Sequence, residues 1–304
     1  MFIPVVHFQE GKKMTEKMFI PKGKKLLDPK IDSTFKTIFT KDGDSSQVAL
    51  RSLVGAIIGH EPDEVTVVGN ELPVEVMYAK SIRLDLQCRM KDGSHIALEM
   101  QTCPSNDNLK ERSLYYGSRI VSGLDMKGRF YSDLPRVYQV MFTNFPLFGQ
   151  GSNFIQTFTM RNSEEELSDN LKIIFIQMPL LDARYEELEN LPELEKWVIF
   201  LREGSEPEKR ELLNRLMASS KGIKEAGEIL MTISDDEREW FIQESRYKAQ
   251  MDYESGLLLA KHDGKEEGRV EGKMEDARGM KAENIPIETI IKITGLTPEQ
   301  VAAL

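Results

Sequence analysis

Apolar positions in the first part of the chain alternate between the spacing of helices and the spacing of strands. Apolar residues three and four apart predict helices over residues 32–39, 48–58 and 108–126. Between and after these segments, short runs with period two predict strands. The predicted strands are residues 65–68, 74–78, 82–90, 95–101, 137–142, 154–160 and 173–177. This order is typical of an α/β domain in which helices flank a mixed β-sheet.

After Pro179 the strand pattern stops, and the rest of the chain is predicted to be all-helical. Helices are expected over residues 188–201, 208–217 and 237–259, and two short ones over 287–293 and 298–304. The short pair is similar to a helix-turn-helix, although a simple helical pair without DNA contact explains the pattern better. We divide the chain into a basic tail (1–25), an α/β domain (26–180), a helical region (181–260) and a glycine-spaced helix with the short pair (261–304).

The glycine-spaced stretch is charged, with Gly264, Gly268 and Gly272 at intervals of four residues. Each glycine inside a helix costs about 1 kcal/mol relative to alanine. We therefore expect a loose, solvated helix, which would pair with a partner or with a second copy of the chain.

Residues 82–101 predict a β-hairpin with one apolar and one mostly polar face. Directly opposed residues share a face, so matching the two apolar faces restricts the register. A three-residue loop that ends in Gly93 satisfies this restriction and suits a left-handed glycine. It places Asp85 opposite Glu99, with Gln101 one step along the same face. The two Cβ atoms would then lie about 5 Å apart.

Two carboxylates this close raise each other's pKa unless a cation lies between them. Mg²⁺ suits such a pair, because it usually takes one or two carboxylates and completes its shell with water and phosphate oxygens. A bound metal ion can acidify a water molecule and stabilise a phosphoryl group during transfer. The alternative is an exposed polar face on which Arg83 and Arg89 pair with the two acids.

The charge is unevenly distributed along the chain. The 304 residues contain 40 Lys and Arg against 50 Asp and Glu, and a net charge of −10 argues against a nucleic-acid partner. However, residues 1–30 carry a net charge of +4 and residues 76–136 of +3, which leaves −17 elsewhere. The region around the hairpin is therefore mildly basic. Two solvated surfaces of different sign would produce the same distribution.

Several classes of protein and site are not supported by the sequence. No run of about 18 apolar residues could span a membrane, and we expect no secretory signal in residues 1–23. Two cysteines, Cys88 and Cys103, make no disulfide framework and indicate a reducing, cytoplasmic location. The scattered histidines show no zinc-site spacing, and no phosphate-binding or nucleophile-elbow motif is present.

The hairpin motif resembles the PD-(D/E)XK nuclease superfamily. Asp85, followed after a short turn by Glu99-Met100-Gln101, is similar to the D…(D/E)xK core, in the ExQ form of the Rpn family of recombination-promoting nucleases and transposase-like proteins. The resemblance runs from Leu27 to about residue 180 and continues into the glycine-spaced tail. Further similar segments are residues 28–36, the helix with Arg112, Leu114, Tyr115 and Tyr116, and the stretch with Gly128 and Tyr131.

This resemblance implies a metal-dependent DNA endonuclease associated with recombination or mobile elements, with Mg²⁺ or Mn²⁺ as cofactor and DNA as partner. Asp85 and Glu99 would bind the metal, together with a backbone carbonyl, and Gln101 would orient the attacking water in place of the superfamily's lysine. Asp32 would be the helix-borne acid that joins them, or alternatively only an N-cap. The superfamily's proline is replaced by Leu84.

The resemblance also implies contacts with DNA phosphates. Arg112 would clamp a phosphate, Lys36 and Arg83 would add further contacts, and Tyr115 would support the site through its hydroxyl group. The alternatives are ordinary surface charge for Lys36 and Arg83 and simple packing for Tyr115. Two other functions remain open: an inactive nuclease-fold protein that binds DNA or protein and oligomerises, and a regulatory partner in a toxin or phage-defence pair.

Overall fold

The computed structural model describes residues 19–41, 43–69, 84–104, 108–149, 151–182 and 184–304. The predicted strand over residues 74–78 and the predicted phosphate contact Arg83 lie outside these residues. The chain divides into two compact units, the first ending at Arg246 and the second beginning at Tyr247. Within the described part of the chain, no helix combines the length and the apolar character needed to cross a membrane.

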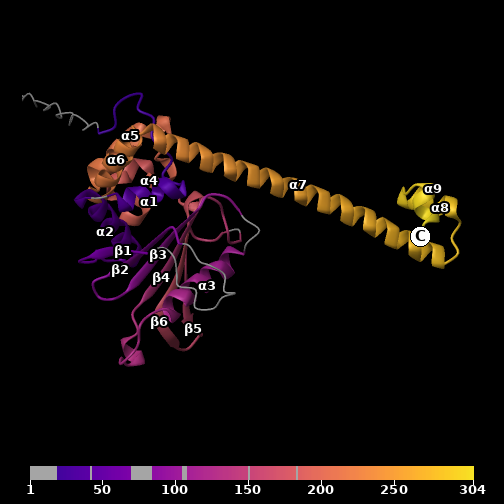
Figure 1. The fold of residues 1–304 in the computed structure, drawn as a ribbon, viewed down its shortest axis with the longest axis horizontal. Coiled ribbons are helices and arrows are strands. Elements are labelled where there is room, and N and C mark those ends of the chain that lie inside the picture. The colour runs from indigo at the N-terminus through magenta and orange to yellow at the C-terminus, as the bar shows by residue number, and fades with distance from the viewer. Residues whose placement is uncertain (1–18, 42, 70–83, 105–107, 150, 183) are drawn as a thin grey trace, which may run out of the picture. The chain divides into compact units, whose positions relative to one another are not determined.

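Among the described residues, six strands form one mixed sheet in the first unit (Figure 1). They are β1 (Val65–Val68), β2 (Leu86–Met90), β3 (His95–Gln101), β4 (Val137–Thr143), β5 (Ile155–Arg161) and β6 (Glu166–Gln177). Their order across the sheet is β1-β2-β3-β4-β6-β5. The central strands β3, β4 and β6 run parallel, and the remaining pairs are antiparallel. The predicted α/β fold is therefore confirmed.

The β2–β3 hairpin has the predicted register. Arg89 pairs with His95, and the Met90 N–H donates a hydrogen bond of 2.8 Å to the carbonyl oxygen of Ser94, which closes a three-residue loop. Gly93 ends this loop with a φ of +88°. That left-handed conformation is easily adopted only by a residue without a Cβ atom. The loop chemistry and the alternation of apolar residues therefore specify the same pairing.

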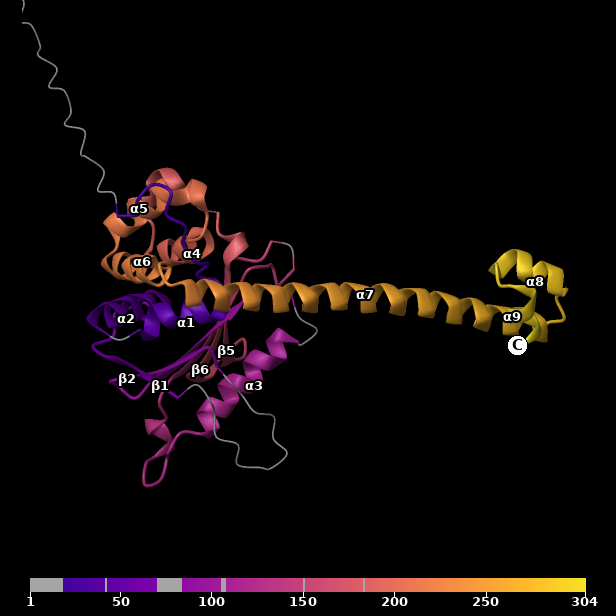
Figure 2. The ribbon, with the colours of Figure 1, turned by 45° about the horizontal axis from the view of Figure 1, so that its top comes forward.

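Helices cover both faces of the sheet (Figure 2). On one face lie α1 (Asp32–Thr40) and α2 (Asp44–Ile58), and on the other lies α3 (Leu109–Ser122). The apolar face of the hairpin packs against α1 and α2, whereas Ala97 on the opposite face packs with Leu109 and Ile120 of α3. Gln87 and Glu99, on that second face, are each only 6% exposed. The alternative of an exposed polar face is therefore wrong around the acid pair, whereas Arg89 near the loop of the hairpin is exposed.

Three further helices extend the core beyond α1 and α2 (Figure 2). They are α4 (Glu193–Glu203), α5 (Arg210–Ser219) and α6 (Lys221–Ile233). Gly222 permits the close approach of α6 to α2, because a Cβ atom there would lie 2.1 Å from Cβ of Ser52. The buried Trp197 of α4 donates a hydrogen bond from Nε1 to Oγ of Ser52 at 3.1 Å. A single large core therefore joins these helices to the sheet layer.

The second unit begins at Tyr247, within α7 (Glu237–Ala282), which is one continuous helix through the glycine-spaced stretch. The predicted helix in this stretch is thereby confirmed. The short helices α8 (Ile287–Thr294) and α9 (Pro298–Ala302) follow it. Ala277, Ile290 and Val301 form their small shared core. Thr297 and Gln300 make a reciprocal capping box ahead of α9.

Some elements differ from the sequence predictions in their bounds. β6 begins at Glu166 instead of residue 173, because its first residues are exposed or half-buried, such as Leu167, and show no alternation of buried and exposed side chains. The sequence pattern does not predict α6, because Gly222 and Gly227 interrupt its apolar face. Short 3-10 helices are η1 (Tyr131–Asp133), η2 (Met178–Leu180), η3 (Tyr185–Asn190) and η4 (Pro207–Lys209).

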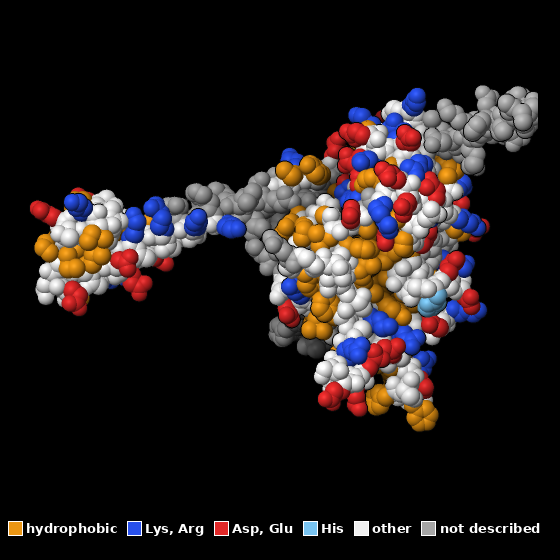
Figure 3. All heavy atoms as spheres, turned by 180° about the vertical axis from the view of Figure 1, so that it is seen from behind, with side chains coloured by type: hydrophobic (Ala, Val, Ile, Leu, Met, Phe, Trp, Pro, Cys, Tyr) orange, Lys and Arg blue, Asp and Glu red, His pale blue; other side chains and the backbone are white. Residues whose placement is uncertain are grey.

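The uneven charge along the sequence does not divide the visible surface into one basic and one acidic region. On the face of the first unit that Figure 3 shows, Lys and Arg side chains are interspersed with Asp and Glu. Specific pairs contribute to this mixture, including Arg215 with Glu189 at 2.9 Å and Lys224 with Glu228 at 2.9 Å. Exposed pairs of this kind contribute little to stability individually. Local clusters are therefore more informative about function than the net charge.

Candidate active site

Asp85 and Glu99 are held against each other by the backbone of the hairpin. The Asp85 N–H donates a hydrogen bond of 2.9 Å to Oε1 of Glu99, and the Met100 N–H donates one of 2.7 Å to Oδ2 of Asp85. Each carboxylate thus binds the backbone of the other strand, which restricts both side chains. Oδ1 of Asp85 and Oε2 of Glu99 accept no hydrogen bond from any described residue. With respect to the described residues, one oxygen atom of each acid therefore remains available to a ligand.

The environment raises the pKa of both acids. Burial raises the pKa of Glu99 to about 8, and the negative charge of Asp85 adds to this effect. Burial also raises the pKa of Asp85 to about 6, with Asp32 as the neighbouring like charge. Backbone hydrogen bonds and the guanidinium of Arg112 oppose both shifts. Two buried acids without a cation between them are unfavourable when ionised, and a divalent ion would remove that penalty.

Arg112 supplies positive charge on this face of the sheet. Its Nη2 donates a hydrogen bond of 2.8 Å to Oε1 of Gln101, and Nε2 of Gln101 donates one of 2.9 Å to the carbonyl of Cys103. The guanidinium carbon lies 5.8 Å from the ring centroid of Tyr116. Asn108 caps the N-terminus of α3 with its side chain. The cap begins the helix where its first turn brings Arg112 to the end of β3.

Asp32 and Lys36, both in α1, lie close enough to Asp85 to affect its ionisation. Asp32 raises the pKa of Asp85 and Lys36 lowers it. Oδ2 of Asp32 also accepts a hydrogen bond of 2.7 Å from Nη1 of Arg246. The N-cap position of α1 is occupied by Ile31, and Asp32 is the first helical residue. The alternative interpretation of Asp32 as an N-cap is therefore wrong.

The predicted site residues do not all meet at the hairpin. Tyr115 is 40% exposed, and it is the neighbouring Tyr116 whose ring lies beside Arg112. The hydroxyl group of Tyr115 forms no hydrogen bond with the described residues. Arg246 is a neighbour of the site that the sequence did not indicate, because it lies 214 residues from Asp32. No local signal connects positions so far apart.

The donor set limits which metal ion the site could hold. In the described part of the chain, no group of three or more His, Cys, Asp and Glu side chains is arranged around a common point. Zinc, which takes three or four protein ligands, therefore has no site there. Mg²⁺ and Mn²⁺ accept fewer protein ligands and bind oxygen atoms. The two unshared oxygens of Asp85 and Glu99 fit such an ion.

Comparison with known families agrees with this geometry. A family model described as a PD-(D/E)XK nuclease family transposase matches residues 29–260. The chain belongs to this PD-(D/E)XK nuclease family. The match includes α1, the hairpin, α3 and the helices up to the middle of α7, and it confirms the resemblance seen in the sequence. No curated protein and no solved structure matches the chain.

The PD-(D/E)XK site of this chain departs from the motif at two positions, which the structure places differently. Leu84 occupies the position of the motif's proline and is fully buried in the apolar cluster under α3 with Ala97 and Leu109. Gln101 occupies the position of the lysine and connects Arg112 to the end of β3. The first departure is therefore part of the packing, whereas the second lies within the polar site.

Proposed function

We propose that the chain is a metal-dependent DNA endonuclease that hydrolyses phosphodiester bonds in recombination or in the movement of mobile elements. The observation that supports this proposal most directly is the Asp85–Glu99 pair. The register of the hairpin brings the two carboxylates together, the backbone restricts them, and one oxygen of each accepts no hydrogen bond from a described residue. PD-(D/E)XK nucleases typically use divalent metal ions, and this donor set fits Mg²⁺ or Mn²⁺.

The residues around the pair would have distinct tasks. A bound divalent ion would supply an acidified water and neutralise negative charge on the phosphate. Asp85 and Glu99 would hold the ion, and Arg112 would bind a phosphate oxygen through its guanidinium. Gln101 already holds Arg112 in place, and its amide oxygen has a second lone pair that can orient a water molecule. Lys36, near Asp85, would add a further phosphate contact.

The proposal is tested by nicking of supercoiled plasmid DNA in Mg²⁺ or Mn²⁺. We expect Asp85→Asn and Glu99→Gln each to reduce the rate by about 100-fold or more, because each removes one charged ligand from the ion. Asp182→Asn is the matched control, since Asp182 is exposed and remote from the hairpin in the sequence. Equal nicking by wild type and Asp85→Asn would show that another site, or a contaminant, is responsible.

A second candidate function is a nuclease-fold protein that binds DNA without cutting it. The ion pair between Asp32 and Arg246 favours this alternative, because it occupies an acid that the family resemblance assigns to the site. Tight binding of DNA by wild type, without cleavage in Mn²⁺, would support this alternative. Arg246→Gln would then distinguish a masked site from an inactive one, since release of Asp32 should restore cleavage only if the site is masked.

The C-terminal helices are proposed, as the sequence predicted, to pair with a partner or a second copy. Ile293 of α8 is 61% exposed and Ile287 is 50% exposed, which leaves apolar surface on a short helix. Light scattering coupled to size-exclusion chromatography of the full chain measures the oligomeric state directly. A monomer at high protein concentration would contradict self-association.

A further inference from the structure

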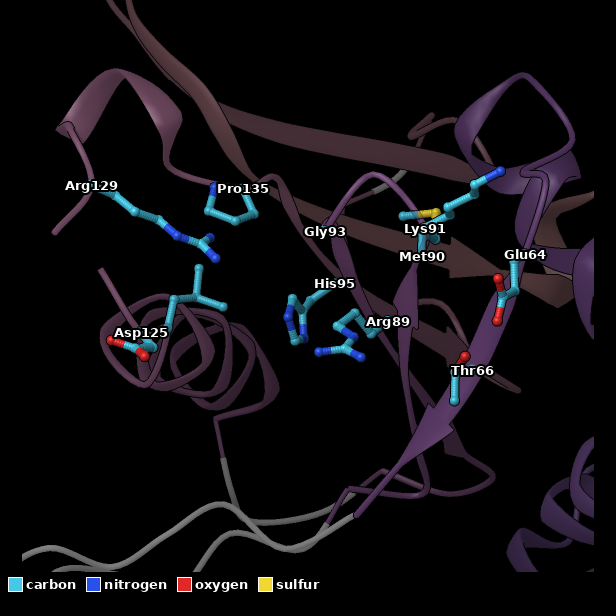
Figure 4. Close-up of a pocket in the computed structure, with 11 residues that line it drawn as sticks. Glu64, Thr66, Arg89, Met90, Lys91, Gly93, His95, Asp125, Arg129 and Pro135 are labelled. Carbon is cyan, nitrogen blue, oxygen red and sulfur yellow. The ribbon is translucent and has the colours of Figure 1, made fainter. Parts of the chain in front are cut away.

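A pocket of about 440 Å³ lies at the opposite end of the hairpin from the acid pair (Figure 4). Thr66, Arg89 and His95 face it from three neighbouring strands, because Thr66 pairs with Arg89 and Arg89 pairs with His95. Arg129 closes it from the segment that follows α3. The pocket stays open because α3 ends at Ser122 and does not cover this end of the sheet.

The pocket contains two arginine side chains whose charge no described residue neutralises through an ion pair. Neither Arg89 nor Arg129 forms an ion pair with any described residue, whereas Lys91 at the rim pairs with Asp63 at 3.6 Å. Arg89 stands directly opposite His95 in the ladder, and burial and the charge of Arg89 lower the pKa of His95, which favours its neutral form. An anion bound between the two strands would pair with Arg89 and accept a hydrogen bond from the imidazole.

Two acidic residues, Glu64 and Asp125, also line the pocket, but neither forms an ion pair with Arg89 or Arg129. Asp125 accepts a hydrogen bond of 3.0 Å from the Lys127 N–H, and its carboxylate points away from the pocket in Figure 4. Glu64 lies on the other side of the pocket from Arg129 in the same view. Arg89, His95 and Arg129 point into the space between them (Figure 4). The ligand chemistry that fits is a phosphate group.

Two aromatic side chains stand exposed directly after Arg129. Phe130 is 78% exposed and Tyr131 is 89% exposed, and hydrophobic side chains project at the end of the first unit where η1 lies (Figure 3). Gly128, with a φ of +75°, turns the chain before them. Asp133 then accepts a hydrogen bond from the Phe130 N–H at 3.3 Å. These bonds hold the loop in a defined conformation, so the rings are presented to solvent instead of folding back onto the core.

Guanidinium groups without an ion pair among the described residues, close in sequence to exposed rings, form a combination that suits single-stranded nucleic acid. Guanidinium groups bind the backbone phosphates, and unstacked bases stack on aromatic faces. We propose that Arg89, His95 and Arg129 bind a backbone phosphate of a single-stranded DNA segment, and that Phe130 and Tyr131 stack against its bases. This inference rests on the proposed nuclease function and names a second contact with the same substrate.

The second contact lies on the same face of the hairpin as the acid pair. His95 and Glu99 are four residues apart in β3 and share a face, a separation of about 13 Å at the rise of an extended strand. A single strand spans this distance with about two or three nucleotides. The pocket would therefore hold an unpaired stretch a few nucleotides away from the phosphodiester at Asp85 and Glu99.

The test measures binding of a fluorescent 20-nucleotide oligothymidylate by anisotropy in EDTA, where no metal-dependent cleavage proceeds. We expect Arg89→Gln with Arg129→Gln to weaken binding by about tenfold or more, and to lower the slope of log affinity against log salt by about 0.7, the value for one phosphate contact on a single strand. Phe130→Ala with Tyr131→Ala should weaken binding by about fivefold or more without changing the slope. All four side chains are exposed, so circular dichroism should show an unchanged fold.

Matched controls separate the pocket from charge and aromatic content in general. Arg161→Gln removes an exposed arginine in β5, and Phe241→Ala removes an aromatic side chain that is 72% exposed in α7. Both should bind as wild type does. Effects of the pocket variants no larger than those of the controls would overturn the inference, as would a failure of wild type to bind the oligonucleotide.

Three further arms identify the ligand and separate this inference from the proposed cleavage. An abasic oligomer should lose the effect of the aromatic variants but keep that of the arginine variants, and a duplex should bind more weakly than the single strand. Saturable binding of inorganic phosphate at the pocket without oligonucleotide binding would overturn the proposal in favour of a free phosphate ligand. Pocket-dependent binding without cleavage in Mn²⁺ would contradict only the nuclease proposal.

Discussion

At the scale of single residues, the acid pair combines two unfavourable features. Glu99 is 6% exposed, and Asp85 lies close enough to raise its pKa further. Burial of an ionisable group without a counter-ion destabilises a folded protein. The reciprocal backbone hydrogen bonds offset part of this penalty for each acid. A bound cation would offset the remaining penalty of ionising the two acids, which is why the pair supports the proposal of a metal site.

The raised pKa of Glu99 predicts how the stability of the metal-free protein depends on pH. Its pKa is about 8 in the folded protein against an ordinary 4.5, so folding takes up a proton between these values. The contribution of Glu99 is therefore most favourable below about pH 4.5 and is lost as pH rises towards 8. Glu99→Gln cannot lose a proton, so it should match wild type at pH 5 and melt roughly 3 °C or more higher at pH 8.

This prediction is checked by thermal unfolding in EDTA at both pH values, with Asp182→Asn as the control. Addition of Mn²⁺ at pH 8 should raise the melting temperature of wild type and leave that of Glu99→Gln almost unchanged. Identical melting of wild type and Glu99→Gln at pH 8 would show that Glu99 is not destabilising when ionised.

Arg112 predicts a change in the pH dependence of metal binding. Its charge lowers the pKa of both Asp85 and Glu99, so Arg112→Gln should raise both pKa values. Protons would then compete with the metal up to a higher pH, and the midpoint of the rise in Mn²⁺ affinity with pH should move upward. Arg112→Lys keeps the charge but loses the guanidinium group that reaches Gln101, so it should shift this midpoint less than Arg112→Gln does. Calorimetric titration from pH 5 to 9 measures the midpoint, and unchanged profiles would exclude this role.

At the scale of secondary-structure elements, the hairpin loop determines the geometry of the site. A loop shorter by one residue would turn the side chains of one strand to the other face and separate Asp85 from Glu99. Gly93 stabilises the observed loop because it adopts a φ of +88° without steric cost. The helix α3 contributes Arg112, which contacts Gln101 at the C-terminal end of β3. The helix α1 contributes Asp32 and Lys36, whose charges act on Asp85.

Gly93→Ala should destabilise the first unit by about 1 kcal/mol, because a Cβ atom disfavours the left-handed conformation. Gly149→Ala is the matched control: Gly149 is exposed, has no positive φ, and a Cβ atom there would meet no neighbouring atom within 4 Å. Urea denaturation should show the loss only for Gly93→Ala. Equal stabilities of the two variants would indicate that the loop can change its conformation at no cost.

At the scale of the whole molecule, net charge is a poor guide to the partner. The chain carries −10, yet Arg89 and Arg129, which form no ion pair with a described residue, line one pocket, and the charge of Arg112 acts on the acid pair. Phosphate contacts depend on such local groups because salt screens the remaining charge within about 10 Å. The acidic residues of the C-terminal half therefore do not argue against a nucleic-acid substrate.

The two units have separate cores, which predicts that they unfold separately. Ile290 is fully buried in the small core of the second unit, so Ile290→Ala should destabilise that unit by about 2 kcal/mol or more. Ile293→Ala, in the same helix but 61% exposed, is the control. Hydrogen exchange should become faster in α8, α9 and the end of α7, while β2 and β3 keep their protection. Faster exchange in the sheet would show that the units are coupled.

The sequence predicted the elements with strong periodicity and the residues that depend on them. Asp85, Glu99 and Gln101 were placed together because a hairpin with a defined loop relates its strands by local rules. Arg112 was assigned by family resemblance, and the structure places it beside Gln101. Arg246 could not be predicted, since its contact with Asp32 depends on the packing of two helices distant in sequence. Arg83 lies outside the described residues, and its role stays a prediction.

The sequence by itself determined the α/β class, the register of the hairpin and the pairing of its two acids, because these follow from local periodicity and turn chemistry. The tertiary structure decided what covers each face. It buried Glu99 on the face that α3 covers and left Arg89 exposed and His95 half-buried at the other end of the same face. Alternation assigns side chains to faces, but only the packing of helices determines which part of a face remains open to a ligand.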